Sequence, residues 1–175
     1  MTDYPAHLTR EHHLFDGRTV VIRPVRQNDA VLEREFIDEL SGDSRYLRFH
    51  KWVHAPSDKL IHFLTDIDYE RHLALVCIAS DAGREKLVGE ARYVADGGGR
   101  NCEFGIMIAD GWHNSGIAGL LMADLIAAAR ARGLATMEGM VITSNSKMLR
   151  FARGLGFTIE RMDEDPATTR IVKVL

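Results

Sequence analysis

The most informative segment of the chain is Ile106-Met107-Ile108-Ala109-Asp110-Gly111-Trp112-His113-Asn114-Ser115-Gly116-Ile117-Ala118-Gly119. It begins as an apolar strand, passes through a turn at Asp110-Gly111 and enters a helix start that carries glycines. A helix N-terminus exposes unpaired backbone N–H groups and a partial positive charge, so small residues there let a pyrophosphate approach the backbone. The segment therefore predicts an anion-binding turn. A helix capped by Asn114 or Ser115, with glycine serving close packing, remains an open alternative.

Three strands are predicted immediately before this turn. Residues 72–80 contain a continuous apolar run, which is typical of a strand buried on both faces. Residues 87–94 and 102–109 follow as two more strands, joined by the loop Gly97-Gly98-Gly99. Short connections between successive strands predict an antiparallel meander.

Helices and strands alternate over the rest of the chain. Residues 19–23 form a β-branched run ended by Pro24, and residues 29–40 have helical spacing of apolar positions. Because helices cross between strands, the pattern predicts a mixed α/β architecture. The other predicted elements are a loop at 41–49, helices at 56–64, 115–132 and 146–153, and strands at 135–142, 158–162 and 170–174.

Length and composition indicate a single domain over residues 1–175. Lys and Arg total 22 and Asp and Glu total 25, giving a net charge of −3. This balance provides no basic excess for binding nucleic acid or an anionic membrane. The longest apolar stretch, residues 117–129, is interrupted by Asp124 and is shorter than the roughly 18 residues of a membrane span. We therefore expect neither nucleic acid nor membrane as a partner.

Cysteine and histidine usage points to a cytoplasmic protein without a metal. The two cysteines, Cys77 and Cys102, lie inside apolar segments, which suits a reducing compartment better than a disulfide framework. The start of the chain has no apolar signal core. The eight histidines form no metal-ligand motif, and His12-His13 is predicted to be solvated.

The turn contains neither a Walker loop nor a Rossmann glycine pattern. Its sequence His113-Asn114-Ser115-Gly116-Ile117-Ala118, followed by Asn145 and Gly156-Phe157, resembles the signature of the GNAT acetyltransferase superfamily. That signature reads [Q/R]-x-x-G-x-[G/A] between a strand and a long helix. His113 departs from its first position, which leaves the backbone turn intact but removes the usual side chain.

The resemblance extends over nearly the whole chain and is greatest to the acetyltransferase domain of Pat-type protein lysine acetyltransferases. It implies an α/β (α+β) fold, with a mixed, mostly antiparallel sheet of about six to seven strands, splayed at the acetyl-CoA site and flanked by about four helices. The residues that carry it include Gly17-Arg18, Ile22-Arg23-Pro24, Ser44-Arg45-Tyr46, Glu103-Phe104, Arg132-Gly133-Leu134 and Met148-Leu149.

The resemblance also implies acetyl-CoA as co-substrate. Its pantetheine would pair with the backbone of residues 106–108, which amounts to adding a strand, and its pyrophosphate would contact the amides of residues 114–119. Ordinary core packing is an open alternative for Met148 and Phe151. The implied cofactor-binding residues are Ile106, Met107, Ile108, His113, Asn114, Ser115, Gly116, Ile117, Ala118, Gly119, Asn145, Met148 and Phe151.

Glu103 is the candidate general base. A lysine amine is mostly protonated at pH 7, so acetyl transfer requires proton removal. Glu103 lies in an apolar strand, which would raise its pKa, and the resembling family has a glutamate at the matching position. A solvent-facing carboxylate or an ion pair with Arg92 is the alternative. Glu90 is a secondary candidate by strand alternation, while Asp110 is expected to cap.

Other parts of the acceptor site are less defined. A backbone N–H around Met107 is expected to stabilise the oxyanion. Many GNAT enzymes protonate the leaving thiolate with a tyrosine at the position of Ala152, so water would return the proton here. The loop at 41–49 would border the acceptor, with Arg45, Tyr46 and Arg48 as candidate contacts or as structural ties. Glu90 and Glu103 would form an acidic cleft that prefers a cationic amine.

These observations favour an enzyme, an acetyl-CoA-dependent N-acetyltransferase that acts on a primary amine. A protein lysine is the expected acceptor, and a small-molecule amine is the alternative. His113 and Ala152 also leave open a non-catalytic acetyl-CoA sensor, and another acyl-CoA is a further possible donor. A homodimer is possible by resemblance.

Overall fold

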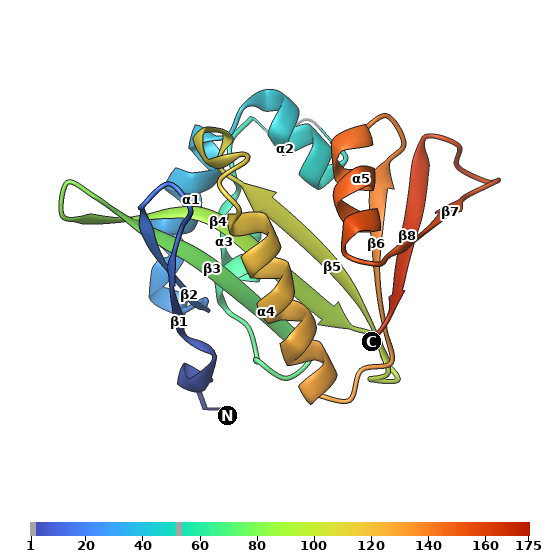
Figure 1. Ribbon diagram of the computed structural model, residues 1–175, viewed down its shortest axis with the longest axis horizontal. Helices are drawn as coiled ribbons and strands as arrows, with labels where there is room; N and C mark the ends of the chain where they lie inside the picture. The colour runs from blue at the N-terminus through green and yellow to red at the C-terminus, as the bar shows by residue number, and fades with distance from the viewer. Residues whose placement is uncertain (1–2, 52–53) are drawn as a thin grey trace.

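An eight-stranded sheet runs through the centre of the protein, with the strand order β1-β2-β3-β4-β5-β6-β8-β7. The computed structural model describes residues 3–51 and 54–175 (Figure 1). Neighbouring strands are antiparallel except β5 and β6, which are parallel. The strands are β1 (Arg10–His13), β2 (Thr19–Pro24), β3 (His72–Asp81), β4 (Arg84–Ala95), β5 (Asn101–Ile108), β6 (Thr136–Ile142), β7 (Thr158–Arg161) and β8 (Thr168–Val174).

Helices cover both faces of this sheet. Helix α4 lies against one face of β3, β4 and β5, while α1 and α3 pack on the opposite face (Figure 1). Helix α5 packs beside β7, and α2 lies near the end of β5. The α-helices of the described residues are α1 (Ala30–Glu39), α2 (Gly42–Phe49), α3 (Asp58–Thr65), α4 (Ile117–Ala131) and α5 (Ser146–Gly154).

The predicted mixed, mostly antiparallel sheet is confirmed, as is the meander of β3, β4 and β5. Eight strands and five α-helices are observed in the described residues, whereas about six to seven strands and about four helices were expected. The additional strand is β1, because Arg10–His13 pairs with β2 instead of being a solvated segment. His12 Nε2 lies 3.4 Å from Asp124 Oδ2 on α4, which ties β1 to that helix.

The prediction of a loop at residues 41–49 was wrong, since this segment forms α2. The Ser41 hydroxyl accepts a hydrogen bond from the Ser44 amide at 3.1 Å, as an N-cap residue does. The helix ends at His50, whose φ of 56° is left-handed. A serine cap before a short helix with few buried apolar residues was too weak a signal to identify it from sequence.

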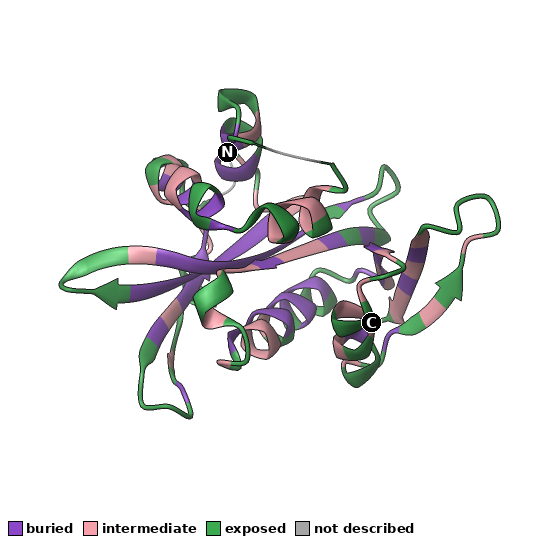
Figure 2. Ribbon diagram, turned by 90° about the horizontal axis from the view of Figure 1, so that it is seen from above, coloured by how far each residue is buried: buried purple, intermediate pink, exposed green. Residues whose placement is uncertain are grey.

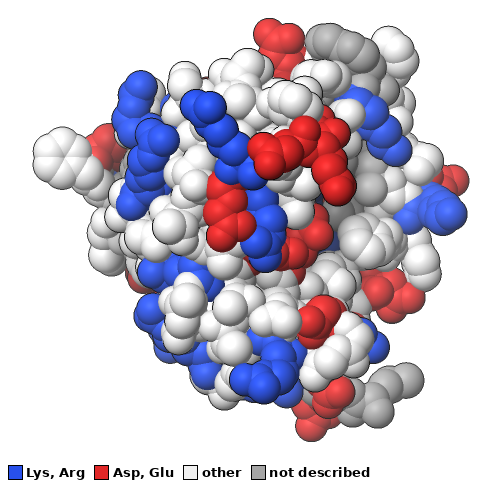
Figure 3. Space-filling view, turned by 90° about the vertical axis from the view of Figure 1, so that its right-hand side faces the viewer, with Lys and Arg blue, Asp and Glu red and all other residues white. Residues whose placement is uncertain are grey.

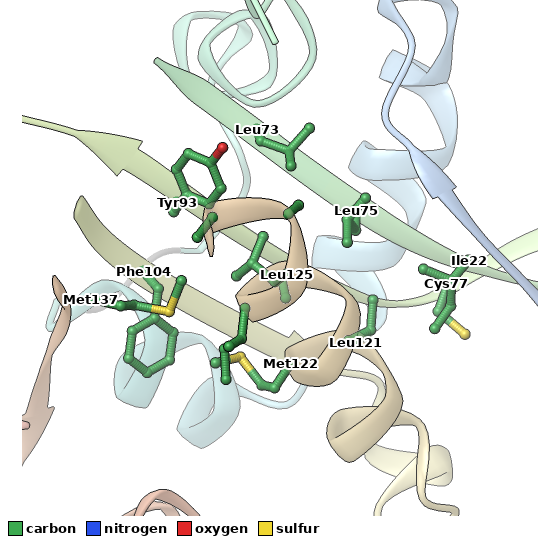
Figure 4. Close-up of a cluster of buried hydrophobic side chains, with 14 of the residues drawn as sticks. Ile22, Leu73, Leu75, Cys77, Tyr93, Phe104, Leu121, Met122, Leu125 and Met137 are labelled. Carbon is green, nitrogen blue, oxygen red and sulfur yellow. The ribbon is translucent and has the colours of Figure 1, made fainter. Parts of the chain in front are cut away.

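The core lies on both faces of the central strands. Leu121, Met122 and Leu125 of α4 pack against Leu75, Tyr93 and other side chains of the sheet (Figure 4). A second cluster joins α1 and α3 to the opposite face. Strand β3 is therefore buried on both sides, as its continuous apolar run predicted. Figure 2 shows the central strands and the inner side of α4 as buried, and the β7 region as largely exposed.

The sheet splays between β5 and β6. Their pairing is limited to residues 101–103 with 136–138, whereas β5 stays paired with β4 as far as Ile108. The ring of Phe104 lies against Gly139 at the point of divergence, where a β-carbon built on Gly139 would be 2.7 Å from a ring carbon. The same ring is 5.1 Å from that of Phe157, centroid to centroid. The Phe104 ring (Figure 4) thus lies at the point where β5 and β6 diverge.

A β-bulge lies on the other side of the same region. The register between β3 and β4 shifts between Cys77 and Ile78, which pair with Gly89 and Leu87 and leave Val88 as the extra residue. Bulges bend a strand and strengthen its twist. The Val88 carbonyl accepts a hydrogen bond from the Ala109 amide at 2.8 Å, so the bulged segment holds the end of β5 where the chain leaves the sheet.

The surface of the described residues carries mixed charge. Figure 3 shows Lys and Arg interspersed with Asp and Glu over the face on which β7 and β8 lie. On β8, Arg170 pairs with both Glu138 and Glu160. Within the described part of the chain, no helix is long and apolar enough to span a bilayer.

We predict that Gly139→Ala destabilises the protein by roughly 1–3 kcal/mol, because the added methyl group overlaps the Phe104 ring. Urea denaturation of the two proteins measures the effect. Gly154→Ala is the control, since a β-carbon there meets no atom within 4 Å. A Gly139→Ala protein as stable as the wild type would show that Phe104 is not confined by this glycine.

Candidate active site

A cavity of about 900 Å³ opens where β5 and β6 diverge. Its walls come from β5, the turn leading into α4, the middle of β6, α5, and α2 with the residues just after it. In Figure 1 these elements meet at the open end of the V formed by β5 and β6. Segments far apart in sequence therefore form one site.

The cavity is lined by most of the predicted cofactor residues. Two of them, Ser115 and Ile117, do not line it. The Ser115 hydroxyl donates to the Trp112 carbonyl at 2.6 Å, and the Ile117 side chain is fully buried in the core. The lining residues that were predicted are Ile106, Met107, Ile108, His113, Asn114, Gly116, Ala118, Gly119, Asn145, Met148, Phe151 and the candidate base Glu103.

The turn before α4 presents backbone amides to the cavity. Asn114 and Gly116 adopt left-handed conformations, with φ of 62° and 92°. The Leu120 amide donates to the Gly116 carbonyl at 3.3 Å, so the amides of Ala118 and Gly119 precede the first turn of helical bonding. A β-carbon on Gly119 would meet no atom within 4 Å, which leaves the backbone open to approach. This geometry fits an anion at the helix start.

The edge of β5 that faces the cavity offers backbone groups from alternate residues. Ala109 donates to Val88, and the same antiparallel register pairs Met107 with Glu90. Polar backbone groups alternate in direction along a strand, so those of Met107 point to β4 and those of Ile106 and Ile108 point to the cavity. The Ile106 and Ile108 amides, rather than the expected one at Met107, are therefore placed to act on a bound group.

His113 and Asn145 both have intramolecular partners. The His113 ring Nε2 lies 3.2 Å from the Ile108 carbonyl oxygen, which holds the turn against the end of β5. The Asn145 side-chain oxygen accepts from the Met148 amide at 3.2 Å and caps α5. Both residues line the cavity as well, so capping and ligand contact are compatible.

Helix α5 contributes Met148 and Phe151 to the cavity wall. Both side chains are partly buried and pack against the main core cluster, so the core-packing and cavity-lining interpretations both hold. Ala152, the position of the tyrosine in many GNAT enzymes, is fully buried. The structure therefore places a small apolar side chain in the core where that hydroxyl would be.

Glu103 lies at the inner end of the cavity, at the last β5–β6 pair. Its side chain is exposed, so the apolar surroundings expected from the strand sequence are not present. The alternative ion pair with Arg92 is not formed either, because Arg92 pairs with Glu90. Glu103 is an accessible carboxylate, with its proposed role still a prediction.

Glu90 does not reach the cavity. It faces the same side of the sheet as Glu103, as alternation predicted, but α1 and α3 cover it and it is completely buried. Arg92 Nε donates to Glu90 Oε1 at 2.9 Å, and Arg92 also contacts the Leu64 carbonyl at 3.1 Å and His72 Nε2 at 3.0 Å. The predicted acidic cleft is therefore wrong.

The buried network around Arg92 also includes Glu33 of α1. Glu33 Oε1 lies 3.7 Å from Arg92, and neither Glu33 oxygen has a hydrogen-bond partner among the described residues. Burial, and then the charge of Glu90, raise the pKa of Glu33 well above its ordinary value. Burial opposes ionisation of Glu90 too, but the charge of Arg92 holds its pKa below the usual range. Burial and Arg92 lower the pKa of His72 to about 4, so it is neutral at pH 7.

Asp110 connects the start of α2 to the end of β5. It accepts hydrogen bonds from the Ser41 amide at 2.7 Å and the Ser44 hydroxyl at 2.5 Å. Partial burial opposes ionisation, but these hydrogen bonds hold the pKa of Asp110 below its usual range. Asp110 therefore caps the start of α2, as expected of a capping residue, and it holds that helix beside the cavity.

Several lining residues were not predicted, and most of them lie on α2, just after it or on β6. Arg48 was only a loop candidate, whereas it lies on α2 over Gly105 of β5. Arg45 instead donates to the His54 carbonyl at 2.6 Å. In the sequence, the serine cap at Ser41 was the one available signal that a helix begins there. The small residue Gly139 was the signal that β6 could line the cavity. The unpredicted lining residues are Leu40, Ser44, Leu47, Phe49, His50, Lys51, Phe104, Gly105, Trp112, Gly139, Met140, Val141 and Lys147.

The cysteines and the possible metal-binding side chains of the described residues form no further candidate site. Burial raises the pKa of both Cys77 and Cys102 to about 12, so these free thiols are unreactive. Over residues 3–51 and 54–175, no cluster of three or more His, Cys, Asp or Glu side chains is arranged to hold a metal ion.

Comparison with known proteins connects this geometry to a family. Residues 19–158 match the family model described as Acetyltransferase (GNAT) domain. The acetyltransferase PA5475 of Pseudomonas aeruginosa is 36% identical over 152 residues, which cover 87% of this chain and 82% of that protein.

Solved structures show the same arrangement. The GNAT domain of S. lividans PAT superposes with a TM-score of 0.89 at 26% identity, covering 99% of this chain and 100% of that chain. A cAMP-binding acyltransferase from Mycobacterium smegmatis gives a TM-score of 0.63 at 24% identity, over 94% of this chain and 46% of that one. The yncA protein of Salmonella typhimurium, solved with acetyl-CoA, shares the fold at a TM-score of 0.68 and 16% identity, covering 89% and 94% of the two chains.

We predict that Glu33→Gln changes the pH dependence of stability. The folded protein retains a proton on Glu33 that the unfolded chain releases above about pH 4.5, so wild-type stability falls with rising pH from there to the raised pKa. Relative to the variant, the loss is up to about 1.4 kcal/mol per pH unit within that window. Chemical denaturation between pH 4 and 9 measures it.

Glu35→Gln is the matched control, because Glu35 lies on the same helix in an exposed ion pair with Arg84. Its stability should follow the wild type within about 0.5 kcal/mol throughout. Parallel curves for Glu33→Gln and wild type would contradict a proton held on Glu33.

Proposed function

Since this chain belongs to the GNAT family of acetyltransferases, we propose that it transfers an acetyl group from acetyl-CoA to a primary amine, with a protein lysine as the first acceptor to test. The observation that carries the proposal is the free edge of β5 next to the turn before α4, within one cavity. The similarity to the GNAT domain of S. lividans PAT supports the choice of acceptor.

The residues of this cavity fit acetyl-CoA. Pantetheine is a flexible chain with two amides, which pair with the backbone groups of Ile106 and Ile108 as an added strand does. The pyrophosphate lies on the amides of Ala118 and Gly119, where the helix dipole favours negative charge. Met148 and Phe151 provide the apolar wall opposite. The thioester then lies toward Glu103, because the turn and Glu103 are at opposite ends of the free β5 edge.

Glu103 acts as the general base in this proposal. It removes a proton from the ammonium or the attacking amine, directly or through water, which its exposed position permits. The new C–N bond forms as the C–S bond breaks, and the Ile106 amide stabilises the oxyanion. The thiolate takes its proton from water, because Ala152 provides no acid and a thiol with a pKa near 8.5 is an adequate leaving group.

We predict that Glu103→Gln lowers kcat by roughly 10²- to 10⁴-fold and leaves acetyl-CoA binding unchanged, because a neutral amide cannot accept the proton. Release of free CoA with a lysine peptide as acceptor gives the rate. Glu138→Gln is the control, since Glu138 is the β6 partner of Glu103 and binds Arg170. Unchanged turnover in Glu103→Gln would refute the base, and tight acetyl-CoA binding without turnover on any amine would indicate a sensor.

We predict that Gly119→Glu weakens acetyl-CoA binding at least tenfold more than Gly119→Gln does. Both side chains have the same size and enter open space, but only the carboxylate repels the pyrophosphate at the helix start. Calorimetry with acetyl-CoA measures both affinities, and propionyl-CoA in parallel tests the acyl preference. Equal affinities for the two variants would show that the phosphates bind elsewhere.

A further inference from the structure

Arg48 of α2 is a partly buried cation whose Nε atom lies in the interior. Its guanidinium lies directly over Gly105 of β5, where a β-carbon would be 2.6 Å from Arg48 Cζ. The Nε atom is buried and has no hydrogen-bond partner, and over residues 3–51 and 54–175 no carboxylate lies within ion-pair distance. The Arg48 guanidinium also lies near the Phe49 ring, with 5.4 Å between Cζ and the ring centroid.

The buried arginines Arg23 and Arg92 are paired with carboxylates. Arg45, whose Nε is also buried without a partner, donates through another nitrogen to the His54 carbonyl. Arg23 binds both oxygens of Asp29 at 2.7 and 2.8 Å, and Arg92 binds Glu90 together with a carbonyl. Burying a charge without a partner is costly, and a guanidinium stays protonated at any physiological pH. Burial does lower the pKa of Arg48, and the charges of Glu90 and Glu103 only partly offset this. An anionic ligand would compensate the cost.

The position of Arg48 indicates that its anionic ligand is a group of the acceptor substrate. Gly105 and Glu103 are two residues apart on one strand, so they face the same side and lie roughly 6–7 Å apart. The turn that fits the pyrophosphate lies beyond Ile108, at the other end of the free edge. A molecule that reaches Glu103 with its amine therefore passes next to the Arg48 guanidinium.

The charged residues that line the cavity also favour an acceptor with an anionic group. Its described lining residues include three cations, Arg48, Lys51 and Lys147, and a single carboxylate, Glu103. Glu90, which would have favoured a purely cationic acceptor, is neutralised by Arg92 outside the cavity. A carboxylate and a guanidinium side by side complement an acceptor that carries both signs of charge.

We propose that Arg48 binds a carboxylate of the acceptor, so that the preferred substrates are amines whose carrier presents a carboxylate a few bonds from the reacting nitrogen. This proposal rests on the proposed acetyl transfer. The carboxylate comes either from a free amino acid or from an acidic side chain next to lysine in a peptide. In both cases the guanidinium provides a charge-assisted, bidentate contact.

Matched acid and amide acceptors test this proposal. The pairs are L-alanine with L-alaninamide, and N-acetyl-Glu-Lys-amide with N-acetyl-Gln-Lys-amide, each assayed for kcat/KM and for binding to the CoA-saturated protein by calorimetry. We expect wild type to prefer the acid in at least one pair by roughly tenfold to hundredfold. The pair that shows the preference identifies the source of the carboxylate.

In Arg48→Met, we expect the ratio of kcat/KM for acid over amide to fall to within about twofold. Arg48→Lys should keep part of the preference, because lysine retains the charge but cannot make the bidentate contact of a guanidinium. Gly105→Ala, which displaces the guanidinium, should reduce the preference as well. Arg45→Met is the control on the same helix, since Arg45 binds the His54 carbonyl outside the cavity. The KM for acetyl-CoA should be unchanged in all four variants.

The outcomes separate this inference from the proposed function. Glu103-dependent turnover without an acid preference, or with a preference that survives Arg48→Met and Gly105→Ala, overturns the inference and leaves the acetyl transfer intact. An equal loss of kcat for acids and amides overturns it too, because Arg48 would then act on the oxyanion. If no acceptor is turned over, the acetyl transfer fails, and the binding preference still decides the role of Arg48.

Discussion

The early end of β5–β6 pairing is the constraint on which the site depends. The Phe104 ring packs against Gly139 just beyond the last strand pair, and Gly139 permits this close approach because it has no side chain. The two strands diverge from that point. The divergence frees one edge of β5, opens the cavity and allows α5 to line its far wall. The contact between this aromatic ring and the glycine thus marks the point at which the sheet opens into the candidate site.

The same sheet face holds two electrostatic environments. Under α1 and α3, Glu90 and Arg92 form an ion pair, while burial and the charge of Glu90 raise the pKa of Glu33 well above its ordinary value. Farther along the same face of the sheet, the cavity begins, and both Glu103 and Arg48 line it. The charge of Glu90 is thereby compensated internally by Arg92, while the groups at the cavity keep their capacity for external partners. The proposed acceptor preference depends on this difference between the compensated charges under the helices and the charged groups at the cavity.

Much of the fold and part of the site could be predicted because their signals are local. The apolar run in β3, the glycine loop after β4 and the turn at residues 113–119 each encode their structure within a few residues, and the family resemblance follows from them. Helix α2 and strand β1 were missed because both are short and polar. Their stability comes from distant partners, Asp110 for α2 and β2 for β1.

By itself, the sequence determined the order of most elements, the backbone turn before α4 and the side of the sheet on which Glu90 and Glu103 both lie. Only the tertiary structure decided that Glu90 is buried against Arg92 while Glu103 is exposed, and that Arg48 lies over Gly105 with no ion-pair partner among the described residues. Strand alternation is a property of neighbouring residues. Desolvation and pairing of charges depend instead on which helices, far away in sequence, cover each position.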